Sequence, residues 1–64
     1  MNLSDLKRGN RAKIIKVFNL RFQEMGIKEG KILEVLQCLG DSCLIKIDFC
    51  VFAVNGKEII VEKI

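Results

Sequence analysis

The side chains best suited to chemistry in this sequence are three cysteines, Cys38, Cys43 and Cys50, in a chain with no histidine. Cys38 and Cys43 flank a short turn at residues 39–42, so we expect them to lie opposite one another on two strands, close enough for a disulfide or a shared metal ion. A closed tetrahedral zinc site needs four ligands, more than three cysteines supply. We therefore predict ordinary thiols in or beside strands. A metal site at Cys38 and Cys43, completed by Asp41 or a second molecule, is the less favoured alternative.

Size and composition exclude an enzyme. The chain has 64 residues and lacks histidine, the commonest general base and imidazole metal ligand. A domain of this size buries only about 60% of the surface that its unfolded chain exposes, which leaves too little core for a catalytic cleft. We predict no enzymatic activity and no catalytic residues.

The number of cysteines and the distribution of apolar residues indicate in which cellular compartment the protein is expected. An odd number of cysteines leaves at least one thiol unpaired within the chain, which fits a reducing compartment. No apolar run approaches the roughly 18 residues of a membrane span, and the N-terminus has no signal-peptide pattern. We predict a cytoplasmic protein without direct membrane insertion.

Charge is spread unevenly along the chain. Residues 1–31 hold eight basic and three acidic side chains, whereas residues 32–64 hold three basic and five acidic ones. The basic half could face nucleic acid, anionic lipid or an acidic protein surface. All four aromatic residues are Phe, and none stands in a Gly/Lys-rich RNA-binding signature, so we do not expect nucleic-acid binding.

The apolar pattern predicts a small, mainly β domain. Residues 20–25 are expected to form its one short helix, because they lack β-branched side chains and are flanked by Asn19, a suitable N-cap, and Gly26, a suitable C′ residue. A tight turn is expected at Asn55-Gly56. Strands are expected at residues 11–18, 32–38, 43–48, 52–54 and 59–64. Five short strands with closely spaced turns indicate a strongly bent antiparallel β-barrel.

Two strands show how side chains should be divided between core and surface. In the first, Ile14 and Val17 are three residues apart, so a β-bulge near Ile15 or Lys16 is needed to bring both into one core. Residues 32–38 alternate more regularly, with Leu33 and Val35 facing one side and Ile32, Glu34 and Leu36 facing the other. The apolar residues on this second face leave a homodimer through residues 32–38 as an open expectation.

A resemblance to a known family begins at residues 21–30. This segment reads R-F-Q-E-M-G-I-K-E-G and resembles the R-L-x-E-M-G-L-x-x-G helix and turn of ferrous iron transport protein A, the FeoA family. The pattern L-x-x-L-x-x-G-x-x-A-x-I-x-x-V at residues 3–17, G-x-x-L-x-V at residues 30–35 and I-x-V at residues 59–61 are also similar to that family. Gly26 and Gly30 are expected in turns that need glycine. Departures occur at Glu29, where the family often has Pro, and at Phe49, where it has Gly. The resemblance implies an SH3-like barrel over residues 1–64.

The resemblance also implies a function. It identifies a small cytosolic accessory protein of bacterial ferrous iron uptake that binds and modulates FeoB, the membrane GTPase-linked ferrous permease, through its cytosolic GTP-binding region. We expect the contacts at Lys13 and Lys16 of the basic first strand and at Arg21 and Met25 of the helix. For Met25, core packing is favoured over partner contact, because long apolar side chains at helical spacing usually face a core.

Two alternatives from other classes stay open. The same barrel resembles the C-terminal domain of iron-dependent repressors, which would make the chain a free-standing metal-responsive regulatory domain or a metallochaperone. A ribosomal type of RNA-binding barrel would show salt-dependent RNA affinity. No tightly bound cofactor is expected, although weak binding of a transition metal such as Fe²⁺ or Zn²⁺ is compatible with the cysteines.

Overall fold

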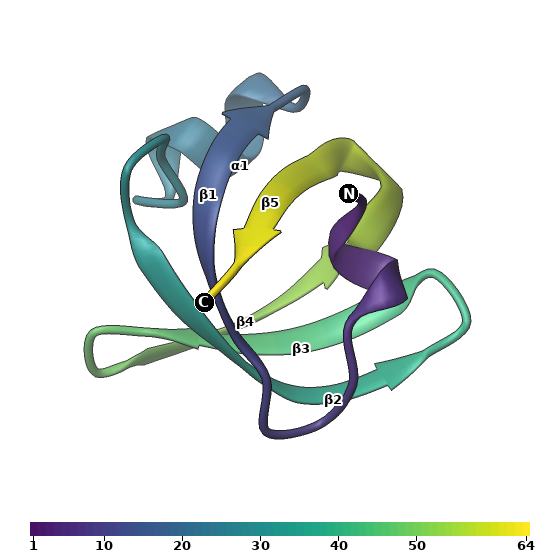
Figure 1. The fold of residues 1–64 in the computed structure, drawn as a ribbon. Helices are drawn as coiled ribbons and strands as arrows, with labels where there is room; N and C mark the ends of the chain where they lie inside the picture. Colours follow the sequence, from purple (N-terminus) through teal and green to yellow (C-terminus); the bar gives the residue numbers. More distant parts are fainter.

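Five antiparallel strands form one strongly curled sheet in the computed structural model, which describes residues 1–64 (Figure 1). The strands are β1 (Arg11–Val17), β2 (Ile32–Leu39), β3 (Ser42–Ile47), β4 (Cys50–Asn55) and β5 (Ile59–Lys63). Their order across the sheet is β4-β3-β2-β1-β5, so the outer strands β4 and β5 do not pair and the sheet curls without closing. The prediction of a mainly β, SH3-like fold with about five antiparallel strands and one short helix is confirmed.

The helix α1 (Leu20–Glu24) connects β1 to β2. Asn19 is its N-cap, as predicted, and the Asn19 side chain accepts a hydrogen bond of 2.9 Å from the backbone N–H of Arg21. The helix is shorter than predicted, because Met25 is already the C-cap. Gly26 follows with a φ of +103°, a conformation that glycine adopts without a steric penalty. No helix in the structure combines the length and apolar character needed to cross a membrane.

Two short 3₁₀ helices cover one end of the curled sheet. They are η1 (Leu3–Asp5) and η2 (Gly56–Glu58), and they are in contact with each other. The tight turn predicted at Asn55-Gly56 is wrong: Asn55 is the N-cap of η2, and its side chain accepts a hydrogen bond of 2.9 Å from the backbone N–H of Lys57. Gly56 is buried against η1. The sequence pattern of a hairpin turn thus belongs here to a short helix that closes the end of the fold.

Irregular pairing bends the sheet in two places. The register of β1 against β5 shifts between Ile14 and Lys16, which confirms the predicted bulge and buries both Ile14 and Val17. A second shift, between Val35 and Gln37 where β2 pairs with β3, is not indicated by the sequence pattern. Bulges increase the local twist of a sheet, and these two allow five short strands to wrap around one core.

The core lies inside the curl and contains no polar side chain. The strand residues Leu33, Val35 and Ile45 are each at most 1% exposed, and Leu3 of η1 is fully buried beside them. Phe22 of α1 packs partly against this cluster. β2 pairs with β3 on one side and, over Ile32–Glu34, with β1 on the other, so a second copy could not pair with most of its backbone, and a homodimer through residues 32–38 would have to rely mainly on side chains.

Candidate functional site

A groove separates the segment after α1 from the turn that joins β3 to β4. We call it the helix–hairpin groove. Its volume is about 220 Å³, and it is lined by Met25, Gly26, Lys28, Lys31, Ile47, Asp48, Cys50 and Phe52. Half of this lining is hydrophobic, and the charged part is two lysines and one aspartate. Such a surface is suited to an apolar side chain of a partner framed by polar or acidic groups.

Backbone hydrogen bonds and one buried side chain hold the first wall of the groove. Ile27 is fully buried and anchors residues 25–31 to the core. The backbone N–H of Gly30 donates to the carbonyl of Ile14 over 2.8 Å, and the N–H of Ile14 donates to the carbonyl of Lys31 over 2.8 Å. Gly30 has a φ of +88°, in the region that favours glycine. The side chains on this wall therefore project from a fixed loop.

The second wall is the two-residue turn Asp48-Phe49, between the paired residues Ile47 and Cys50. Asp48 has a φ of +56°, which only glycine adopts freely and which Asp tolerates better than most residues. The Lys31 Nζ atom lies 3.3 Å from Oδ2 of Asp48, an exposed ion pair that spans the two walls. Phe49 is 97% exposed at the tip of the turn. An aromatic side chain with almost no intramolecular contact is available for a partner.

The structure does not gather the residues predicted to bind a partner. Met25 lies in the groove and is 46% exposed, so the prediction that it packs in the core is wrong. Lys13 and Lys16 are exposed on β1, and Arg21 is exposed on α1, but none of these three lines the groove. The Lys16 Nζ atom instead lies 5.2 Å from the centre of the Phe18 ring, a cation–π contact.

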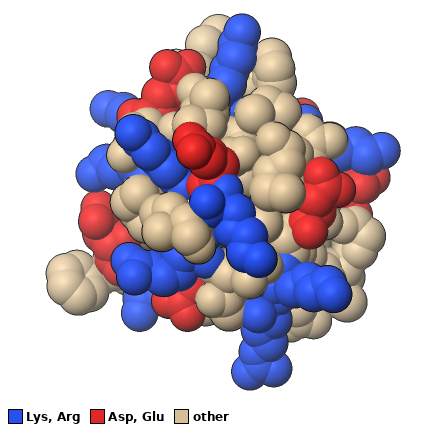
Figure 2. Space-filling view, in the orientation of Figure 1, with Lys and Arg blue, Asp and Glu red and all other residues tan.

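Basic side chains do not form one continuous patch on the face that Figure 2 shows. Lysine and arginine are spread over this face, with acidic and uncharged side chains between them (Figure 2). On this face, positive charge is therefore not concentrated at one place. Of the basic side chains in residues 1–31, only Lys28 and Lys31 line the groove.

Three residues in or beside the groove were not among the predicted partner contacts: Lys28, Lys31 and Phe49. Lys28 and Lys31 belong to the basic half of the chain, but nothing in their spacing shows that they approach the β3–β4 turn. For Phe49 a signal was present, because an aromatic residue in a two-residue turn between alternating strands has no inner face to occupy. An aromatic residue in a position where turn residues are expected is a reason to suspect a contact surface.

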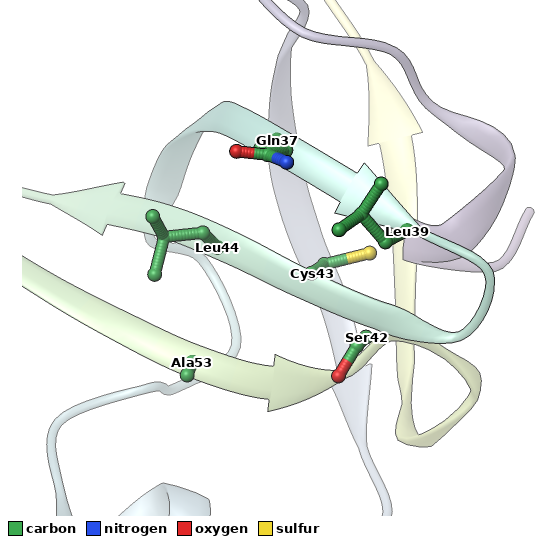
Figure 3. Close-up of a pocket in the computed structure, with 6 residues that line it drawn as sticks. All are labelled: Gln37, Leu39, Ser42, Cys43, Leu44 and Ala53. Carbon is green, nitrogen blue, oxygen red and sulfur yellow. The ribbon is translucent and has the colours of Figure 1, made fainter.

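A second hollow lies on the outer side of the sheet near the β2–β3 turn (Figure 3). It has a volume of about 210 Å³ and carries no charged side chain; its lining is Gln37, Leu39, Ser42, Cys43, Leu44 and Ala53. Its volume is close to that of the helix–hairpin groove, so volume alone does not decide which of the two is the better candidate for a binding site. The helix–hairpin groove is the better candidate site because it combines apolar and cationic groups with an exposed aromatic residue beside it.

The three cysteines form one bonded pair and one free thiol. Cys38 and Cys43 pair directly across β2 and β3 and are joined by a disulfide, with their Cα atoms 4.1 Å apart. The prediction of ordinary thiols is therefore wrong for these two residues, and the alternative of a cross-strand disulfide is the one observed. Cys50 is free and exposed on β4, in the lining of the helix–hairpin groove. No three side chains of the metal-binding types His, Cys, Asp and Glu gather at one point.

The family model of the FeoA domain matches residues 1–63. The chain belongs to the FeoA family. Its members are small accessory domains involved in ferrous iron transport, so the family predicted from residues 21–30 is confirmed. A comparison with curated protein sequences found no match.

Three solved structures share the fold of this FeoA domain. A crystal structure of an iron uptake regulatory protein (FeoA) has a TM-score of 0.86 at 18% identity, covering 100% of this chain and 97% of that one. The FeoA protein from Chlorobium tepidum has a TM-score of 0.85 at 27% identity, with 98% and 70% covered. The FeoA-like protein from Clostridium acetobutylicum has a TM-score of 0.83 at 18% identity, with 98% and 85% covered. The curled five-stranded sheet is thus shared with known FeoA structures.

Proposed function

We propose that this FeoA domain is an accessory protein of ferrous iron uptake that docks on the cytosolic GTP-binding region of a FeoB-type permease and modulates it. The observation that carries the proposal is the helix–hairpin groove, where the half-exposed Met25 and two lysines face a turn that presents Phe49 almost fully to solvent. Burial of these apolar side chains under a partner would supply affinity, and the lysines would favour an acidic partner surface.

Docking would modulate the permease through differential affinity. A module with no catalytic groups of its own changes the activity of a partner only if it binds one conformation of that partner more tightly than another. The walls of the groove are held by backbone hydrogen bonds and a buried anchor, so the surface is preorganised and loses little conformational entropy on binding.

The proposal is tested by NMR titration of the isotope-labelled chain with the soluble GTP-binding domain of the permease. We expect chemical-shift changes at residues 25–31 and 47–50, and about tenfold weaker binding for Met25→Ser and for Phe49→Ser. Leu39→Ser is the matched control, because Leu39 is 69% exposed at the other hairpin end. Shift changes centred on Leu39 instead of the groove would refute the proposed site.

The contacts predicted from the sequence form a separate arm of the same experiment. Alanine substitutions at Lys13, Lys16 and Arg21 would weaken binding if the interface extends from the groove over β1 and α1. If they abolish binding while Met25→Ser does not, the interface lies on those elements and not in the groove. A titration with ferrous iron alone tests the metal-responsive alternative, for which shift changes at Cys50 or at Cys38 and Cys43 are expected.

A further inference from the structure

We propose that Cys38 and Cys43 form a reversible thiol–disulfide site that exchanges with low-molecular-weight thiols and disulfides. The site is independent of the proposed partner groove. It depends on the pairing of these two cysteines across β2 and β3, which places them in bonding contact in the structure.

The hairpin geometry brings the two sulfur atoms together. Leu39 pairs with Ser42 at the base of a two-residue turn, so Cys38 and Cys43 are the second pair from the turn, the first pair without mutual backbone hydrogen bonds. In such pairs the backbones approach most closely, in agreement with the Cα separation of 4.1 Å. Figure 3 shows the sulfur of Cys43 directed towards β2, beside Leu39.

The two cysteines differ in access to solvent. Cys43 is 2% exposed, whereas Cys38 is only partly buried. A Cβ atom added to Gly56 would lie 3.0 Å from Sγ of Cys43, so this sulfur is enclosed by the junction of η1 and η2. We infer that exchange with a small molecule begins at Cys38 and that Cys43 acts as the resolving thiol.

The chemistry balances with a small-molecule disulfide such as oxidised glutathione as the oxidant. The Cys38 thiolate attacks one sulfur of oxidised glutathione, which forms a mixed disulfide and releases one glutathione thiolate. The Cys43 thiolate then attacks the Cys38 sulfur, which forms the Cys38–Cys43 bond and releases the second glutathione thiolate. Two protein thiols lose two electrons and two protons, and one oxidised glutathione becomes two reduced glutathione molecules. An excess of reduced glutathione or dithiothreitol reverses both steps.

The third cysteine provides an internal control. Cys50 pairs with Ile47 at the opposite end of β3, whereas Cys43 pairs with Val54, so no other thiol stands beside the Cys38–Cys43 pair. Cys50 is exposed and should react with the same reagents without forming an intramolecular bond. The chain therefore contains one paired cysteine site and one unpaired cysteine, and both are exposed to the same reagents in a single experiment.

The test is equilibration of the full chain with glutathione at several ratios of reduced to oxidised form, followed by acid quench, alkylation in denaturant and peptide mass spectrometry. We expect oxidised glutathione to protect Cys38 and Cys43 from alkylation with the loss of two hydrogens, and the internal disulfide to exceed the mixed disulfide at Cys38 by about tenfold or more. Dithiothreitol added to the folded protein should restore three alkylatable thiols. Cys50→Ser should retain the whole response.

Two cysteine variants separate the roles of the sulfurs. In Cys43→Ser the mixed disulfide should accumulate at Cys38, and in Cys38→Ser the buried Cys43 should react at least about tenfold more slowly than Cys50 in the same chain. The proposal is overturned if Cys38 and Cys43 stay alkylatable while Cys50 becomes glutathionylated. It is also overturned if the Cys38–Cys43 bond resists dithiothreitol in the folded protein, since the site would then be a permanent crosslink.

Discussion

The strand β3 joins two hairpins whose turns are alike in geometry and exposure but differ in what packs beside them. The β2–β3 turn has Gly40 as its first residue, with a φ of +62°, and the β3–β4 turn has Asp48 there, with a φ of +56°. We call the first the covered end, because η1 and η2 pack over Cys43 beside it. The second is the open end, where Phe49 is 97% exposed. The fold thus encloses the side chain of Cys43 next to the first turn, whose own residues 39–42 are exposed, and leaves the aromatic side chain of the second turn open to solvent.

The difference also sets what each end can tolerate. At the covered end, Gly56 stands where no side chain fits, and the sulfur atom of Cys43 is enclosed beside it. At the open end, a residue with a side chain occupies a backbone conformation that favours glycine, and an exposed ion pair spans the adjacent groove. Steric packing restricts which residue can stand at position 56, whereas a positive φ restricts which residue can stand at position 48.

The largest effect is expected for Gly56→Ala at the covered end. A Cβ atom there would lie 2.7 Å from the backbone nitrogen of Ser4 and 2.9 Å from its Cβ, so η1 and η2 would have to separate. We expect a loss of about 2 kcal/mol in the free energy of unfolding, measured by urea denaturation, with Gly56→Val more severe. In so small a domain this is a large share of the total.

The matched control is Gly40→Ala. No atom lies within 4 Å of a Cβ added to Gly40, so only its positive φ penalises the substitution, by about 1 kcal/mol. If Gly56→Ala costs no more than Gly40→Ala, the packing of η1 on η2 does not limit the covered end.

A smaller effect is expected for Asn19→Ala, because Asn19 joins α1 to η2. Its side chain caps α1 and also donates a hydrogen bond of 2.9 Å from Nδ2 to Oε2 of Glu58 in η2. Loss of both interactions should lower the free energy of unfolding by about 1.5 kcal/mol. The same measurement on Asn55→Ala, which caps η2 through an exposed bond to the Lys57 N–H, should give about half of that loss. Equal losses would mean that the bond to Glu58 contributes nothing.

The sequence predicted local features well where one residue type decides them. Asn19 and Gly26 bound α1 because capping and a positive φ depend on the residue itself. Leu33 and Val35 were assigned to the core correctly, since alternation is a local pattern with a period of two. The bulge between Ile14 and Lys16 was found because two apolar residues at a spacing of three need one.

Features that depend on distant neighbours were not predicted. Met25 fits the pattern of a core residue, but α1 ends at that point, and the side chain faces the groove. Gly56 resembled a turn glycine, whereas its role comes from contact with Ser4, 52 positions earlier in the sequence. The groove itself is formed by two segments that only the curl of the sheet brings together, and no spacing in the sequence encodes that proximity.

The smallest effect, and the one that best tests the comparison of the two turns, is expected for Asp48→Gly at the open end. Glycine removes the penalty of a side chain at a φ of +56°, while the exposed ion pair with Lys31 is lost and the unfolded chain gains freedom. Because the ion pair is exposed and contributes little, we expect a net gain of about 0.5 kcal/mol in the free energy of unfolding. Asp48→Ala loses the same ion pair and increases the penalty, because alanine tolerates this φ less well than aspartate, so it should destabilise the protein by about 1 kcal/mol. Urea denaturation of the three proteins resolves this ordering. Equal stability of the glycine and alanine variants would show that the backbone at Asp48 is not strained. The ion pair with Lys31, and not the positive φ, would then determine which residue is favoured at position 48.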